Sequence, residues 1–180
     1  LASGPPMANA GALKAAMEQE SEFLGHARPV MEFVYDQMQD CGSMVVLANA
    51  QGLLLHSLGD PEFLTRAERV ALRPGALWKE ELRGTNAIGT ALVEGRPVVV
   101  HGAEHYLERH EFLTCSAAPV RAPDGRLCGV LDISGDQRGY HPHTIALVRS
   151  ASRMIEDRLF HARHTSDMLL RLHPRAEGLG

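Results

Sequence analysis

Several features that would assign this chain to a common class of protein are scarce or missing. It has only three cysteines, an odd number, which suits a reducing cytoplasm better than a disulfide framework. No apolar run approaches the roughly 18 residues of a membrane span, and no charged-then-apolar secretory signal opens the chain. The net charge of -4 lacks the basic excess of a nucleic-acid-binding surface. We therefore expect a cytoplasmic domain that contacts no membrane and, through this segment, no nucleic acid.

The composition fits a single folded domain. With 180 residues, 44% of them hydrophobic, the chain can bury a core, and it contains no internal repeat or low-complexity tract. Residues 1–8 show no periodicity and are expected to be a disordered start or a remnant of expression. Residues 9–172 are expected to form the domain, and residues 173–180 a linker.

Hydrophobic periodicity predicts helices at both ends of the domain. The first spans Asn9 to Gln39 and should break near His26 to Arg28, because Pro29 is expected to start a second helix. The last begins at Pro142, with its buried stripe marked by Ile145, Val148, Ala151, Ile155 and Leu159. Both helices should lie together on one face of a sheet.

Alternating apolar runs and turn signals predict the strands and shorter helices between these ends. The expected strands are Met44–Ala48, Leu53–Leu58, Pro97–His101, Cys115–Arg121 and Leu127–Ser134, and short helices are expected over Pro61–Leu72 and Ala103–His110. This order indicates an α+β fold with an antiparallel sheet of about five or six strands.

The run from Trp78 to Leu92 (WKEELRGTNAIGTAL) carries the strongest local signal. It holds the only tryptophan and two glycines, Gly84 and Gly89, which permit positive φ or close approach of the backbone. No lysine follows Gly89, so a phosphate-binding loop of the Walker type is excluded. A bulky aromatic beside such a turn can wall a cavity, whereas the simpler alternative is a tight turn that caps a buried helix.

Two groups of residues could carry chemistry. Histidine is a common metal ligand, and the chain has three close together: His101, His105 and His110. Their spacing places no two of them on the same face of a helix. We therefore favour a solvated helix face, with one or two of these histidines pointing into a pocket. A reactive cysteine would need an activating base or a positive field, and buried cysteine more often acts as a small hydrophobe.

Strand alternation places further polar residues on the sheet. It puts Cys115 on one face of its strand, and Cys128 and Asp132 on one face of the next, so the three would line one cavity if both faces look inward. Asp132 lies between apolar residues, which favours a structural role. We expect it to accept hydrogen bonds from the turn at Gly84 to Asn86.

The terminal helices carry more apolar positions than one buried stripe needs. The surplus positions are Met154, Phe160, Met168, Leu169 and Leu172. We therefore expect a homodimer formed through the terminal helices.

Several strings together resemble one family. They are GTNAIGTAL (84–92), EHYL (104–107), LTCSAAPV (113–120), PDG (123–125), GVLDISG (129–135) and HPHT (141–144). In order and spacing they resemble the GAF domain of bacterial sigma-54-dependent transcriptional activators of the acetoin-catabolism-regulator type. The resemblance covers roughly residues 30–180.

The resemblance implies a sensory domain rather than an enzyme, with the terminal helices on one face of the sheet and a ligand pocket on the other. The family's ATPase and DNA-binding domains would lie outside this chain. The implied ligand is a small metabolite, namely a hydroxyketone, ketone, alcohol or small aromatic, whose binding is relayed through the C-terminal helix; no cofactor or metal is implied. The residues expected to line the pocket are Trp78, Thr85, Asn86, Ile88, His105, Tyr106, Phe112 and Cys115.

Two alternatives remain open from the residues. One is a redox or metal sensor that uses Cys115 together with His101, His105 and His110. The other is an enzyme similar to the GAF-type reductases of free methionine sulfoxide, which use several cysteines.

Overall fold

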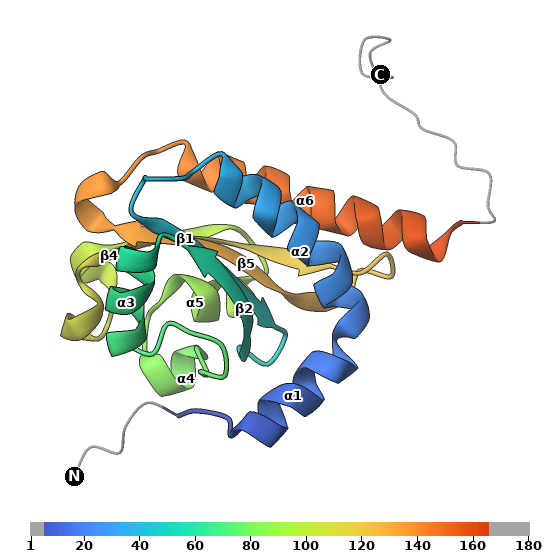
Figure 1. Ribbon diagram of the computed structural model, residues 1–180, viewed down its shortest axis with the longest axis horizontal. Helices are drawn as coiled ribbons and strands as arrows, with labels where there is room; N and C mark the ends of the chain where they lie inside the picture. Colours follow the sequence, from blue (N-terminus) through green and yellow to red (C-terminus); the bar gives the residue numbers. More distant parts are fainter. Residues whose placement is uncertain (1–5, 166–180) are drawn as a thin grey trace.

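A five-stranded antiparallel sheet forms the centre of the domain in the computed structural model, which describes residues 6–165 (Figure 1). The strands are β1 (Ser43–Asn49), β2 (Leu54–Gly59), β3 (Val98–His101), β4 (Leu113–Arg121) and β5 (Leu127–Asp136). Their order across the sheet is β2-β1-β5-β4-β3. The predicted strands and the α+β class are confirmed, with β1–β2 and β4–β5 as the two hairpins.

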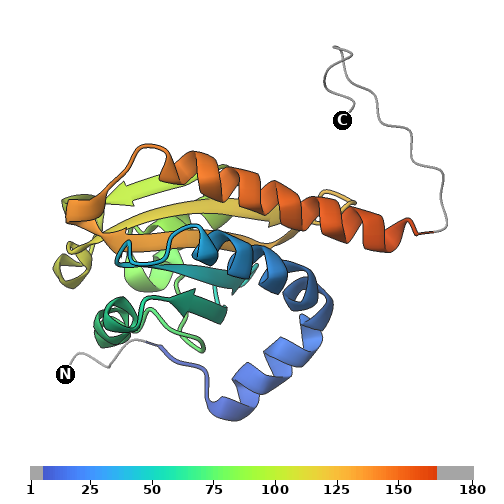
Figure 2. The same cartoon turned by 45° about the horizontal axis from the view of Figure 1, so that its top comes forward.

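Helices cover both faces of this sheet. The helices are α1 (Ala10–Gln19), α2 (Ser21–Asp36), α3 (Pro61–Arg69), α4 (Glu80–Arg83), α5 (Ala87–Glu94) and α6 (Thr144–Arg163), and the 3-10 turns are η1 (Gly102–Glu104), η2 (Glu108–His110) and η3 (Gln137–Gly139). Helices α2 and α6 lie side by side on one face, as Figure 2 shows, while α3, α4 and α5 lie on the other. No helix within residues 6–165 is long and apolar enough to cross a membrane.

Each face of the sheet has its own hydrophobic core. The first core joins α2 and α6 to the sheet, and the predicted stripe of α6 supplies Val148, Ala151, Ile155 and Leu159 to it, with Ile145 half-buried beside them. The second core lies under α3 and α5 and contains Trp78. Alternate residues of β1 point to different cores, as the pleat of a strand requires.

The break predicted near Pro29 is wrong. Pro29 lies inside α2, and the chain bends instead at Glu20, between α1 and α2. A helical proline leaves the carbonyl four residues earlier without its hydrogen bond. Here that carbonyl belongs to Gly25, which is exposed and has open space around it, so water can satisfy the group.

Two other segments differ from the prediction. The single helix expected over Ala103–His110 is replaced by η1 and η2, because the extended backbone of His105 interrupts it. The structureless start predicted through residue 8 is too long, since Met7 forms an antiparallel bridge with Ala76. The predicted end of the last helix beyond residue 165 and the predicted linker lie outside the described residues.

Candidate functional site

Two glycines hold the segment after Trp78 tightly against its neighbours. Gly84 ends α4 with φ at 66°, and an added Cβ there would lie 2.3 Å from ring atoms of Tyr106. Gly89 lies in α5, where an added Cβ would come within 2.7 Å of the backbone nitrogen of Glu80. Both roles expected of these glycines, positive φ and close backbone approach, are therefore found.

Trp78 lies inward, in the second core, with 1% of its surface exposed. Its indole nitrogen donates a hydrogen bond to the carbonyl oxygen of Ala71 at 2.9 Å. The ring of His110 stacks on the indole with 4.9 Å between ring centres, and the guanidinium of Arg83 lies 4.6 Å from the ring centre. The lone tryptophan thus organises a buried cluster of cationic and polar groups.

Arg83 is a charged side chain that is almost fully buried, with 1% exposed. Its Nε and Nη1 donate to the carbonyl oxygens of Leu77 and Val70, but Nη2 has no partner. It forms none of the salt bridges found among residues 6–165. Burial lowers its pKa to about 10, so the guanidinium is still charged at neutral pH.

Two buried histidines complete the cluster. Both ring nitrogens of His110 lack a hydrogen-bond partner, and burial, followed by the nearby Arg83, lowers its pKa to about 3. His105 contacts the Gly102 carbonyl through Nδ1 at 2.9 Å, while its Nε2 has no partner; burial also lowers its pKa. We call Trp78, Arg83, His105 and His110 the Trp78 cluster.

The other residues that were expected to line the pocket are not all buried beside the Trp78 cluster. Ile88 is buried in the second core, and Phe112 packs against it. Both polar atoms of the Asn86 side-chain amide have a partner, since the oxygen accepts from the Gly89 amide at 2.8 Å and the nitrogen donates to the Gly84 carbonyl at 2.9 Å. Thr85 is exposed, and Tyr106 is 74% exposed.

Cys115 and Asp132 do lie on the same face, on neighbouring strands. The Ser134 hydroxyl lies between them, 3.1 Å from the sulfur of Cys115 and 2.5 Å from Oδ2 of Asp132. The other oxygen of Asp132 has no partner, so the expected hydrogen bonds from the Gly84–Asn86 turn are not made. Burial raises the pKa of Asp132 to about 7 and that of the Cys115 thiol well above its usual value.

Cys128 does not lie on this face of the sheet, contrary to the prediction. Val120 pairs with Gly129 and Arg121 with Leu127, so Cys128 is the extra residue of a bulge in β5. A bulge inserts one residue and reverses the alternation of side chains beyond it. The Cys128 side chain consequently lies in the first core, under the terminal helices.

The three histidines of the sequence cluster separate. His105 and His110 face each other edge-on, with 6.2 Å between ring centres, whereas the ring of His101 packs against Tyr140. Within residues 6–165, no three or more His, Cys, Asp or Glu side chains converge as a metal site would require. The structure therefore does not bring Cys115 together with these histidines as a set of metal ligands.

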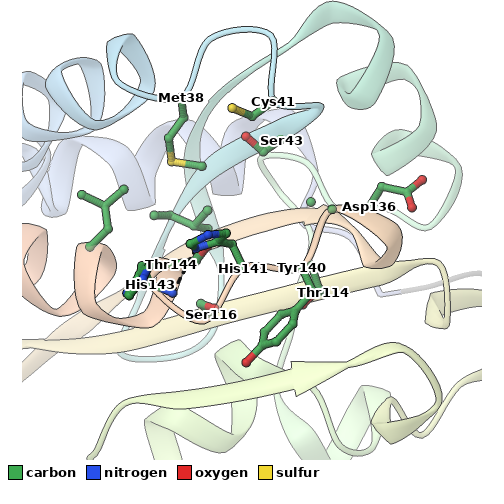
Figure 3. Close-up of a pocket in the computed structure, with 14 residues that line it drawn as sticks. Met38, Cys41, Ser43, Thr114, Ser116, Asp136, Tyr140, His141, His143 and Thr144 are labelled. Carbon is green, nitrogen blue, oxygen red and sulfur yellow. Dashed lines mark hydrogen bonds between the residues drawn. The ribbon is translucent and has the colours of Figure 1, made fainter.

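Sequence reasoning missed Arg83, and it did not include His110 among the residues expected to line the pocket. No local pattern marks Arg83, which stands in a polar run (KEELRG) that is typical of an exposed helix. A second feature also escaped it: a cavity of about 460 Å³ on the opposite face of the sheet, between the end of α2 and the start of α6 (Figure 3).

The fold is GAF-like. It superposes on a chain of the E. coli DhaR(N)–DhaL complex with a TM-score of 0.87, at 17% identity, over 89% of this chain and 55% of that one. A free methionine-R-sulfoxide reductase from Neisseria meningitidis shares the fold more distantly, with a TM-score of 0.52, at 15% identity, over 86% of this chain and 88% of that one.

The chain belongs to the family of MimR N-terminal domains, which matches residues 15–157. It is 36% identical to the acetoin dehydrogenase operon transcriptional activator AcoR of Bacillus subtilis, over 88% of this chain and 26% of AcoR. It is 37% identical to the propane 2-monooxygenase operon transcriptional activator MimR of Mycolicibacterium smegmatis, over 79% of this chain and 25% of MimR. The chain spans about a quarter of the length of these relatives. The resemblance drawn from the sequence motifs is confirmed.

Proposed function

We propose that this domain senses a small oxygenated metabolite for a transcriptional activator, and that the metabolite binds at the Trp78 cluster. Relatives named as operon activators support the regulatory role. The observation that carries the proposed site is the set of buried nitrogen atoms without partners on Arg83, His105 and His110. An unsatisfied buried polar group costs about 1–3 kcal/mol and calls for an explanation, and a ligand oxygen would supply the missing partner.

The chemistry of these nitrogens selects the ligand. Arg83 is always a donor, while a neutral His110 offers one donor and one acceptor. A hydroxyketone, ketone, alcohol or small phenol has an oxygen that can accept from Arg83. All of these except a simple ketone also carry a hydroxyl that can bond to His110. Trp78, Ile88 and Phe112 supply apolar surface for the carbon skeleton. Acetoin and propane appear in the names of the relatives' operons, and these are molecules of this size.

Entry requires a movement, because the unpartnered nitrogens are covered in this form. The exposed ring of Tyr106 lies against Gly84, and its backbone amide donates to the Thr85 carbonyl at 3.1 Å. We infer that the segment 102–111 acts as a lid. Its backbone is not paired in the sheet, so it opens more readily than a strand, and opening draws the buried rings of His105 and His110 away from Trp78.

Occupancy would be relayed through α6. This helix packs across β4 and β5, the strands whose opposite face carries Cys115 and Asp132. A ligand shifts α6 between two arrangements only if it binds one of them more tightly, and a coupling of about 1–3 kcal/mol is sufficient.

Thiol chemistry gains no support from this geometry. Burial raises the pKa of Cys115, and a reactive cysteine needs a lowered one. Neither the reductase alternative nor the redox or metal sensor is therefore proposed.

A thermal-shift screen with acetoin, acetone, 2-propanol and phenol tests the proposal. A true effector at a hundredfold excess over its Kd stabilises the domain by about 2.7 kcal/mol. Arg83→Met should abolish the shift, whereas Arg109→Met, which changes an exposed arginine nearby, should retain it. A hit that shifts the Arg83→Met variant as much as the parent would refute the site.

A further inference from the structure

The cavity of about 460 Å³ lies on the opposite face of the sheet from Trp78 and belongs to the first core (Figure 3). Met38 and Cys41, which follow α2, lie on one side, and Thr144 and Leu147 of α6 lie on another. We call it the α2–α6 cavity. Its volume falls in the range of about 300–1,000 Å³ that is typical of small-molecule sites.

A glycine creates the floor of this cavity. Gly135 of β5 pairs with Ser43 of β1 on one side and with Thr114 of β4 on the other. Between these two side chains the glycine leaves a hollow. An added Cβ on Gly135 would lie 3.6 Å from the Cβ of Ser43, an ordinary contact, so neither strain nor crowding requires glycine here. The backbone therefore does not require glycine at this position, and the missing side chain leaves space on this face of the sheet.

Hydroxyl groups at this floor lack partners. The side-chain oxygens of Ser43 and Thr114 are buried and form no hydrogen bond, and Ser116 adds a third hydroxyl to the lining. Both residues line the cavity, so their hydroxyls are within reach of an occupant. Each hydroxyl can then donate to an acceptor oxygen, which removes the cost of leaving it unsatisfied.

The walls and rim limit the chemistry of an occupant. Met38, Ile133 and Leu147 supply most of the apolar wall, and Tyr140, His141 and His143 also line the cavity. The carboxylate at the rim, Asp136, is already paired with Arg66 at 2.8 Å and with Arg138 at 3.0 Å. These ion pairs hold its pKa well below the usual range, so it remains ionised and offers nothing to a second cation.

We propose that the α2–α6 cavity is a second small-molecule site, separate from the Trp78 cluster, for a neutral compound with an apolar body and one carbonyl or hydroxyl oxygen. The oxygen accepts from Ser43 and Thr114, and the body fills the hollow over Gly135. Because the end of α2 and the first turn of α6 both line the cavity, its occupant contacts the two terminal helices at once.

Titration of the 180-residue chain with acetophenone, followed by 1H–15N NMR, tests this site. Saturable shifts are expected at the amides of Ser43, Thr114 and Gly135, with the indole N–H of Trp78 unchanged. Gly135→Val fills the hollow and should weaken binding by about tenfold or more. The control Gly25→Ala adds a methyl group to open space on α2 and should bind as the parent does.

A second variant tests the role of the Thr114 hydroxyl separately from the space over Gly135. Thr114→Val keeps the shape and should weaken acetophenone about tenfold, the effect of one lost hydrogen bond of about 1.4 kcal/mol, while ethylbenzene binding stays unchanged. The proposal is overturned if acetophenone gives no saturable shifts, if the shifts gather at Trp78, or if Gly135→Val binds as the parent does. Equal loss of both ligands in Thr114→Val would also contradict it.

Discussion

His110 is completely buried, yet neither of its two ring nitrogens has a hydrogen-bond partner. His110→Phe keeps an aromatic ring stacked on Trp78 and removes the unsatisfied atoms. We predict that the free energy of unfolding rises by about 1–3 kcal/mol and that stabilisation by the effector is lost. Urea unfolding with and without the effector measures both quantities. A variant that is less stable than the parent and still responds to the effector would contradict this role.

Asp132 should make stability depend on pH. Its folded pKa, raised to about 7, exceeds the ordinary value of 3.8, so the folded state holds a proton that the unfolded state has released. The resulting stability is fully present below pH 4 and is lost as pH rises to about 7. Asp132→Asn does not titrate. The parent should therefore lose about 2–3 kcal/mol relative to this variant between pH 5 and pH 8.

Urea unfolding of both proteins at several pH values measures this difference. The comparison cancels groups that titrate in both, including His110, whose lowered pKa acts in the opposite direction by destabilising the fold as pH falls below 6.5. A difference that stays constant from pH 5 to pH 8 would show that Asp132 is ionised throughout.

At the scale of elements, α5 depends on one amide at its start. Asn86 caps this helix through the Gly89 amide and closes the turn at Gly84. Asn86→Ala should lower the free energy of unfolding by about 1–2 kcal/mol, the usual cost of a lost N-cap. Because both polar atoms of the amide already have partners within the protein, effector affinity should fall less than in His110→Phe. Denaturant unfolding and a ligand titration check both parts; a larger loss of affinity than in His110→Phe would make Asn86 a ligand contact.

The elements that could be predicted from the sequence are those whose buried residues recur at the regular spacing of a helix or a strand. The stripe of α6, for example Val148, Ala151 and Ile155, repeats at helical spacing and was found as expected. The break predicted near Pro29 was wrong because the apolar face of α2, including Ala27, Val30 and Met31, packs into the first core and keeps the helix continuous although the proline removes one hydrogen bond. Cys128 was misplaced because alternation assumes an uninterrupted ladder, and the bulge at this residue depends on pairing between strands.

The candidate site was only partly predictable for a related reason. The glycine-bracketed turn and the inward tryptophan follow from local residue types. The burial of Arg83 does not, because its carbonyl partners on Leu77 and Val70 are placed by tertiary folding. Similarly, the residue type alone does not indicate whether the side-chain amide of Asn86 caps a helix or binds a ligand.

For the whole molecule, we predict a homodimer formed through the terminal helices. In the single chain, Met154 and Phe160 of α6 are 40% and 39% exposed, although α6 also supplies a full buried stripe to the first core. Replacing both with glutamate should convert the dimer to a monomer without unfolding it, as measured by sedimentation velocity. Arg149→Glu, on the same helix and exposed, is the control; unchanged sedimentation of the double variant would refute the interface.

The central claim, that an effector binds beside Trp78, has a direct optical test because the chain contains one tryptophan. Fluorescence titration with an effector that stabilises the domain should give a saturable change in emission, with a midpoint equal to the Kd from calorimetry. The change should be absent in His110→Phe. An effector that binds by calorimetry but leaves the tryptophan emission unaltered would contradict the account.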